Sequence, residues 1–251
     1  MRSKIVLIGI LLVLLASCGK SPNKLLELAD DHIKAGEYEL AISTYNELIE
    51  SHSEDTLVPE AYYRLARLHL DRMSDYDRGF EILTELTSKY PTSKTSSMAD
   101  ADIIYFPEWL KNMAESQRNK KEIQKTVNTL NYLIGHYPKH EISPKAQYLI
   151  GDIYMNDLRD FSKAIGSYNK VVELFYGSDQ DAHAQFMIGY IYANVLNDNE
   201  KAKETYAVFL EKYPKHELVP SVRFELEYLG MDINEIPVLK HIAGDQPALP
   251  Q

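Results

Sequence analysis

Apolar residues recur at the spacing of amphipathic helices along most of the chain, and prolines divide this pattern into stretches. Prolines that precede such stretches are Pro22, Pro59, Pro144 and Pro220. Proline suits the first turn of a helix, where its missing N–H group costs no intrahelical hydrogen bond. Tyr-Pro pairs that end such stretches are Tyr90-Pro91, Tyr137-Pro138 and Tyr213-Pro214. The pattern predicts helices joined by short loops.

The helical pattern also repeats itself. In each copy a small residue precedes an aromatic residue by three positions, and the next helix carries an alanine four positions before another aromatic residue. The two clearest copies are Ile150-Gly151-x-x-Tyr154 with Ala164-x-x-x-Tyr168, and Ile188-Gly189-x-x-Tyr192 with Ala202-x-x-x-Tyr206, which are offset by 38 residues. Weaker copies start at Leu28 and Leu65, where His32 and His69 take the place of the first tyrosine.

This arrangement resembles the tetratricopeptide repeat, although its copies are longer than the family's repeat of about 34 residues. The resemblance implies an all-α fold, a right-handed α-α superhelix of about five helix pairs in which each pair buries its apolar face against its neighbours. The expected solenoid covers residues 22–230. The expected elements are helix pairs at 22–52, 59–90, 95–137, 144–176 and 181–213, a capping helix at 220–230 and an extended tail at 231–251.

The middle pair is the irregular one. Pro107 lies inside its first helix and should kink or break it, so we expect that helix to be lengthened or split. The sequence Asn119-Lys120-Lys121-Glu122 resembles a capping box, which would restart the chain as a new helix.

The first residues have a different pattern. Arg2 and Lys4 precede an apolar run that is too short to cross a membrane, and small residues follow it, which is typical of a signal peptide over residues 1–17. The run ends in Leu15-Ala16-Ser17-Cys18, with the only cysteine of the chain, and this resembles the lipobox of bacterial lipoproteins. The resemblance implies acylation of Cys18, a lipidated tether at 18–21 and, because Gly19 follows, an outer-membrane location facing the periplasm.

Composition narrows the choice of function. The net charge is −10 with no basic block, which disfavours nucleic-acid binding. The chain has no Gly-rich phosphate loop, no nucleophile elbow and no His-Glu-x-x-His motif. We therefore expect no catalytic residues, no cofactor and no metal site, and hence a protein that is not an enzyme.

The resemblance also assigns a candidate binding surface. In tetratricopeptide proteins the first helix of each pair, the A helix, lines the concave face that binds peptides. Mapping that face onto this chain gives Tyr63, Arg67, Tyr148, Asp152, Asn156, Phe186, Tyr190 and Asn194. Asn156 and Asn194 occupy equivalent positions, where an amide could bond the main chain of an extended peptide or cap its own helix.

These features favour a lipid-anchored scaffold that binds extended peptide segments and envelope assembly partners. Helix pairs behind a lipobox resemble the BamD-type lipoproteins of the outer-membrane β-barrel assembly machine. One alternative is a periplasmic tetratricopeptide adaptor of cell-envelope or division complexes of the Tol-Pal kind. A further alternative is a glycan-binding envelope lipoprotein.

Overall fold

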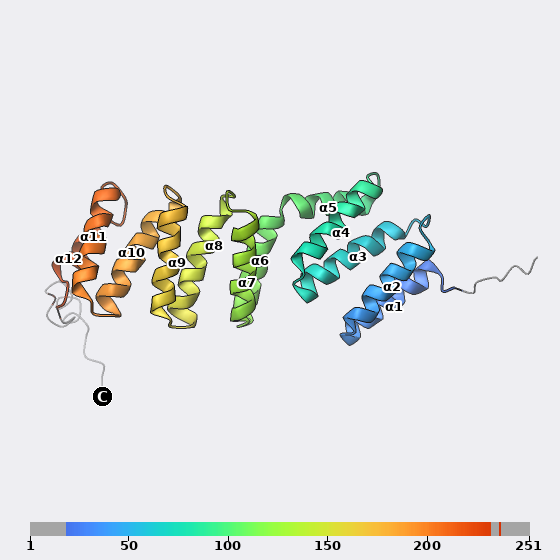
Figure 1. Ribbon diagram of the computed structural model, residues 1–251, viewed down its shortest axis with the longest axis horizontal. Coiled ribbons are helices and arrows are strands. Elements are labelled where there is room, and N and C mark those ends of the chain that lie inside the picture. The colour runs from blue at the N-terminus through green and yellow to red at the C-terminus, as the bar shows by residue number, and fades with distance from the viewer. Residues whose placement is uncertain (1–18, 232–235, 237–251) are drawn as a thin grey trace, which may run out of the picture. The chain divides into compact units, whose positions relative to one another are not determined.

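The computed structural model describes residues 19–231 and 236, and within them it is all helical (Figure 1). The expected signal peptide, Cys18 and most of the tail lie outside these residues. The elements are α1 (Pro22–Ala35), α2 (Tyr38–Ser51), α3 (Val58–Leu68), η1 (His69–Met73), α4 (Tyr76–Lys89), α5 (Lys94–Ile104), α6 (Phe106–Asn119), α7 (Ile123–His136), α8 (Ile142–Asp152), η2 (Ile153–Asp157), α9 (Phe161–Leu174), α10 (Asp179–Asn194), α11 (Asn199–Lys212) and α12 (Val219–Glu227). The predicted all-α fold class is confirmed.

The chain forms two compact units that meet in sequence at Ile104 and Tyr105. In unit 1, α1 pairs with α2, α3 pairs with α4, and α5 packs on α4 and α3. In unit 2, α6 pairs with α7, α8 with α9 and α10 with α11, and α12 packs on α11 and α10. Assembly of both units into one solenoid stays a prediction.

Small residues let the two helices of a pair approach closely. In unit 2 an added Cβ at Gly151 would lie 2.5 Å from Cε1 of Tyr168, and one at Gly189 would collide in the same way with Tyr206. Both tyrosines are fully buried. Unit 1 has fully buried alanine at the matching positions, Ala29 and Ala66, and the first of these repeats also has a buried tyrosine, Tyr45, so the glycine is needed for the closer approach in unit 2 rather than for the tyrosine as such.

The turns inside the pairs share one construction. In each, a backbone carbonyl near the end of the A helix accepts the N–H of the residue that caps the next helix, the B helix. The bonds are Glu37 to His32, Asp75 to His69, Glu122 to Gln117, Asp160 to Tyr154 and Asp198 to Tyr192. The residue before each cap has positive φ, and these residues are Gly36, Ser74, Lys121, Arg159 and Asn197. Only one is a glycine, so the sequence gives little sign of this conformation.

The turns differ in length, since three of them contain one residue more than the other two. In the long turns the cap is an aspartate whose side chain accepts an N–H three residues on, at Arg78, Lys163 and Lys201. Two of these turns absorb the added residue as a π-helical turn, η1 and η2. In the short turns the cap is Glu37 or Glu122, and neither side chain makes a capping bond.

The middle of the chain splits as expected but not as a single irregular pair. The break falls at Tyr105, and Pro107 lies in the first turn of α6. The chain restarts as a new helix as expected, because α7 begins at Ile123. No capping box forms, however, since Asn119 is the last residue of α6 and Glu122 caps α7 without a side-chain bond. Met113-Ala114-x-x-Gln117 and Thr126-x-x-x-Leu130 therefore form a regular repeat, and α5 is the added element.

The two Tyr-Pro-Lys-His-Glu segments, residues 137–141 and 213–217, join successive pairs. Their histidines are partly buried rather than fully solvated. Nδ1 of His140 accepts the N–H of Ile142, and Nδ1 of His216 accepts the N–H of Leu218. Each histidine therefore fixes the entry into the following A helix.

Candidate protein-binding grooves

Two of the candidate residues, Tyr63 and Arg67 on α3, line a cavity of about 260 Å³ in unit 1. Its other lining residues are Asp30, Ile33, Tyr45, Glu60, Arg64, Leu68, Asp71 and Arg72. We call this cavity groove 1. Most of its lining is charged, so its capacity for a partner depends on how those charges are paired.

The arginines of groove 1 are already paired. Arg64 contacts Asp30 at 2.5 Å and Glu60 at 2.7 Å. Its positive charge offsets two carboxylates, and the hydrogen bonds raise its pKa although burial opposes this. The Asp30 carboxylate also accepts the Tyr45 hydroxyl at 2.9 Å, which ties α2 to the same network.

The second arginine is held in the same way. Arg67 binds Asp71 through two bonds of 3.0 Å, and it contacts Asp102 of α5 at 3.3 Å. Tyr63 donates its hydroxyl to the same Asp102 carboxylate at 2.9 Å. Burial, followed by this bond, raises the pKa of Tyr63 to about 12. The two predicted residues of unit 1 therefore bind α5 within the chain.

Three further candidates, Tyr148, Asp152 and Asn156, lie in or just beyond α8. Asp152 accepts the hydroxyl of buried Tyr168 at 2.6 Å, and burial raises the pKa of the Asp152 carboxyl. Tyr148 packs at 5.1 Å on the Tyr168 ring, and burial raises its pKa to about 12. Asn156 is exposed in η2. Asp152 thus serves the helix pair, and Asn156 faces solvent.

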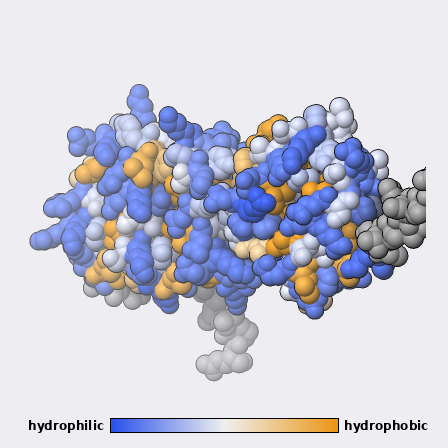
Figure 2. All heavy atoms as spheres, turned by 45° about the vertical axis from the view of Figure 1, so that its right-hand side comes forward, coloured by the Kyte–Doolittle hydropathy of each residue, from blue (hydrophilic) through white to orange (hydrophobic). Residues whose placement is uncertain are grey.

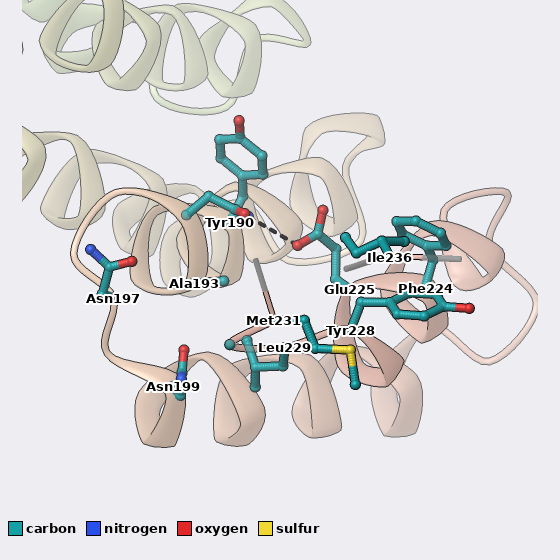
Figure 3. A pocket seen from close by; sticks show the side chains of 12 residues that line it. Tyr190, Ala193, Asn197, Asn199, Phe224, Glu225, Tyr228, Leu229, Met231 and Ile236 are labelled. Carbon is teal, nitrogen blue, oxygen red and sulfur yellow. Dashed lines mark hydrogen bonds between the residues drawn. The ribbon is translucent and has the colours of Figure 1, made fainter. Parts of the chain in front are cut away.

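The last three candidates, Phe186, Tyr190 and Asn194, lie on α10. Tyr190 and Asn194 line a cavity of about 680 Å³ between α10, the start of α11 and α12 (Figure 3). We call it groove 2. Its other lining residues are Ala193, Asn197, Asn199, Phe224, Glu225, Tyr228, Leu229, Gly230, Met231 and Ile236. Phe186 does not line the cavity but packs on the rings of Tyr190 and Tyr206.

Asn194 connects the two walls of groove 2. Its Nδ2 donates to Oε2 of Glu225 at 2.9 Å, so this amide bridges α10 and α12. Phe224 and Met231 are exposed beside it, which leaves an apolar wall open to solvent. Among the described residues that line the groove, Glu225 is the only charged one.

One buried polar group near groove 2 is poorly paired. The Tyr206 hydroxyl is buried without a well-formed hydrogen bond, and burial together with the nearby Glu225 carboxylate raises its pKa. Tyr45 and Tyr168 occupy the same position in their repeats, and each donates to an aspartate of its own A helix. In the last repeat that aspartate is replaced by Tyr190, a residue of the groove lining.

Family comparisons agree with this geometry. Models described as "tetratricopeptide repeat" match residues 26–94, 145–176 and 183–216, which together make up more than half of the chain. The chain belongs to the tetratricopeptide-repeat proteins. No curated protein matches it. Inference about function therefore rests on the tetratricopeptide repeats and the grooves they form.

The solved structures that resemble this chain are distant in sequence. A tetratricopeptide repeat protein from Parabacteroides merdae is 17% identical, covering 84% of this chain and 73% of that chain, with a TM-score of 0.35. MamA from Desulfovibrio magneticus is 17% identical, covering 79% and 98%, with a TM-score of 0.34. The TPR2AB domain of yeast Sti1 in complex with pHSP90 is 16% identical, covering 83% and 85%, with a TM-score of 0.37.

The family models leave residues 95–144 unmatched. This gap contains most of α5 and the tetratricopeptide repeat of α6 and α7, in which Gln117, Thr126 and Leu130 occupy the positions of Tyr154, Ala164 and Tyr168. Their side chains still fill the space between α6 and α7. The Thr129 hydroxyl donates to Oε1 of Gln117 at 2.8 Å, and Leu130 is fully buried.

Several residues that build the two grooves were not predicted from the sequence. Asp30 lines groove 1, Asp102 binds Tyr63 and Arg67 from outside its lining, and Glu225 and Phe224 form a wall of groove 2. The equivalence of Asp30 and Asp152 in their repeats was a usable signal. The sequence held no such signal for Glu225, because α12 is an incomplete repeat.

The described residues contain neither a helix suited to crossing a membrane nor a cluster suited to holding a metal ion. None of the helices there combines the length and apolar character that membrane crossing requires. Within the same residues, no group of three or more His, Cys, Asp and Glu side chains is arranged to hold a metal ion. Figure 2 shows that hydrophilic residues cover most of the face it draws, with smaller hydrophobic areas between them.

Proposed function

We propose that this protein is a lipid-anchored scaffold of the bacterial cell envelope that binds extended segments of partner proteins and catalyses no reaction. Groove 2 is the observation that supports the binding of partner segments. It is a cavity of about 680 Å³ with an open apolar wall, exposed amides and one carboxylate, within the range of about 300–1,000 Å³ in which proteins hold ligands. Its asparagines can bond the main chain of a segment, while the apolar wall takes side chains.

The position of Cys18 supports anchoring. The helical fold begins at Pro22, with Ser21 as its cap, so only Gly19 and Lys20 separate the cap from the cysteine. The Lys20 carbonyl accepts a bond from the His52 ring at 3.1 Å, which ties this short segment to α2. An acylated Cys18 would therefore hold unit 1 close to the membrane surface on the periplasmic side of the outer membrane.

We further propose that the partner machinery is that of outer-membrane β-barrel assembly. The support is the combination of a lipobox with helix pairs and a capping helix, which resembles the BamD-type lipoproteins. A scaffold of that kind would dock a barrel assembly protein and receive extended client segments.

Affinity recovery of the full chain from detergent-solubilised membranes tests this proposal. We expect the wild-type chain in the outer-membrane fraction with a large β-barrel protein, and the Cys18→Ser chain outside that fraction. Recovery with peptidoglycan-binding lipoproteins would instead identify a division adaptor, and recovery alone with a bound glycan would identify a receptor. Either result would overturn the assembly role.

A matched pair of variants assigns the binding to groove 2. Tyr190→Ala with Asn194→Ala should reduce recovery of the partner severalfold, because both side chains line the groove. Tyr176→Ala is the control, since Tyr176 is an exposed tyrosine that lines neither groove. Equal losses in both variants would remove groove 2 from the proposal.

A further inference from the structure

The chain itself enters groove 2 beyond α12. Gly230 adopts a left-handed conformation with φ of 81°, and it turns the chain back after the helix. Met231 and Ile236 both line the groove, and Ile236 is only 8% exposed. In Figure 3, Ile236 lies beside Phe224 and Glu225 of α12. The groove is therefore already lined by apolar side chains that do not belong to a helix, and Ile236 is buried in it.

The remaining surface of groove 2 is unfilled by the described residues. Phe224 and Met231 are exposed although they lie in a concave surface. Among the described residues no basic side chain lines the cavity, so the Glu225 carboxylate lies near the Asn194 amide and the Tyr206 phenol but has no cation beside it. A complementary segment would supply apolar side chains, a cation and main-chain polar groups.

The sequence after Ile236 has this chemistry. It reads Pro237-Val238-Leu239-Lys240, two apolar side chains followed by a cation, and 15 residues of chain lie beyond Ile236. Pro237 restricts Ile236 to an extended backbone, and the tertiary amide of proline removes a donor that would otherwise need a partner. Four extended residues span at most about 14 Å, so the segment stays near the point where Ile236 is buried.

We propose that groove 2 is the docking site of the chain's own residues 237–240. Val238 and Leu239 cover the exposed apolar wall of α12, and the Lys240 ammonium complements the Glu225 carboxylate. Because the segment is tethered next to the groove, its effective concentration is on the order of millimolar. Any partner segment that uses groove 2 must therefore displace the tail, which makes the tail an internal competitor.

Hydrogen exchange of the full chain tests the docking without any partner. Leu239→Asp places a charge on the apolar wall, and we expect exchange of the backbone amides of residues 224–229 to rise about tenfold. Leu249→Asp is the matched control, because it makes the same change in the same tail outside the proposed contact. Equal exchange in wild type and Leu239→Asp, or an equal rise in both variants, would overturn the proposal.

A peptide experiment separates occupation of the groove from a general effect on α12. A fluorescent peptide of residues 236–251 should bind the full-length Leu239→Asp chain at least about tenfold more tightly than the wild-type chain, whose groove is filled. The double variant Leu239→Asp with Glu225→Gln should bind the peptide severalfold more weakly than the Leu239→Asp chain, because it lacks the Glu225 carboxylate. Equal peptide affinity for both chains would contradict docking of the tail. Neither readout involves an envelope partner, so these results are independent of the proposed function.

Discussion

The two grooves use similar positions on their A helices but satisfy their polar groups in different ways. In groove 1, Arg64 and Arg67 each pair with two carboxylates, and Tyr63 donates to one of them. In groove 2, Glu225 faces neutral partners and the apolar residues Phe224 and Met231 are exposed. A partner that enters groove 1 must break existing ion pairs, whereas one that enters groove 2 breaks no ion pair and competes only with the chain's own tail. The position of a residue in the tetratricopeptide repeat therefore does not by itself show that the residue contacts a partner.

The largest effect is expected at the glycine of the last repeat. Gly189→Ala would place a methyl group against the Tyr206 ring, and this should lower the free energy of unfolding by about 1–3 kcal/mol. Ala29→Gly makes the reverse change in unit 1, where it removes only one methyl group and some helix propensity, and should cost about 1 kcal/mol. Urea unfolding followed by circular dichroism measures both. A larger loss for Ala29→Gly would show that the close approach is not specific to unit 2.

The next effect distinguishes the buried tyrosines. Tyr168→Phe removes the donor to the partly buried Asp152 carboxylate and should cost about 1.5–3 kcal/mol, the range for hydrogen bonds to charged groups. Tyr206→Phe removes a hydroxyl that makes no well-formed hydrogen bond, so we expect a much smaller loss of stability. Thermal and urea unfolding of the two variants check this. Equal costs would mean that Tyr206 is paired after all.

The sequence predicted the frame of the fold, since the prolines and the repeated small and aromatic residues placed nearly all of the helices. It did not predict the regular third repeat, because Gln117, Thr126 and Leu130 fill the same space with different chemistry. It could not predict how groove 1 is paired. Arg67 and Asp102 are far apart in the chain, and their contact depends on α5, an element outside the repeat pattern. The helix face on which each candidate residue lies was predictable. Which of these residues are occupied by contacts within the chain was not.

A third effect appears at alkaline pH and occurs in both units. The pKa values of Tyr63 and Tyr148 are raised to about 12 from an ordinary 10.0, mainly by burial. A raised pKa means that the unfolded chain loses these protons first, so stability is complete below pH 10 and declines as the pH rises toward 12. Tyr63→Phe and Tyr148→Phe should each make this decline shallower. A pH series of urea unfolding tests it, and unchanged slopes would contradict the burial of these phenols.

The smallest effects concern the polar groups of the two grooves. Arg67→Ala removes a partly exposed ion-pair network and should cost about 1 kcal/mol, because solvent screens such pairs. Asn194→Ala removes one exposed hydrogen bond and should change stability by less than about 0.5 kcal/mol. The same unfolding measurements apply. A greater cost for Asn194→Ala would make this residue structural and weaken its assignment to binding.

Site-specific photo-cross-linking in intact membranes tests the central claim that groove 2 takes segments and groove 1 does not. A photoreactive phenylalanine analogue would replace Tyr190 of groove 2, Tyr63 of groove 1 or the exposed Tyr176 as a control. We predict that position 190 gives adducts with a partner protein, and that positions 63 and 176 give few. Adducts that form at position 63 as readily as at position 190 would contradict the account.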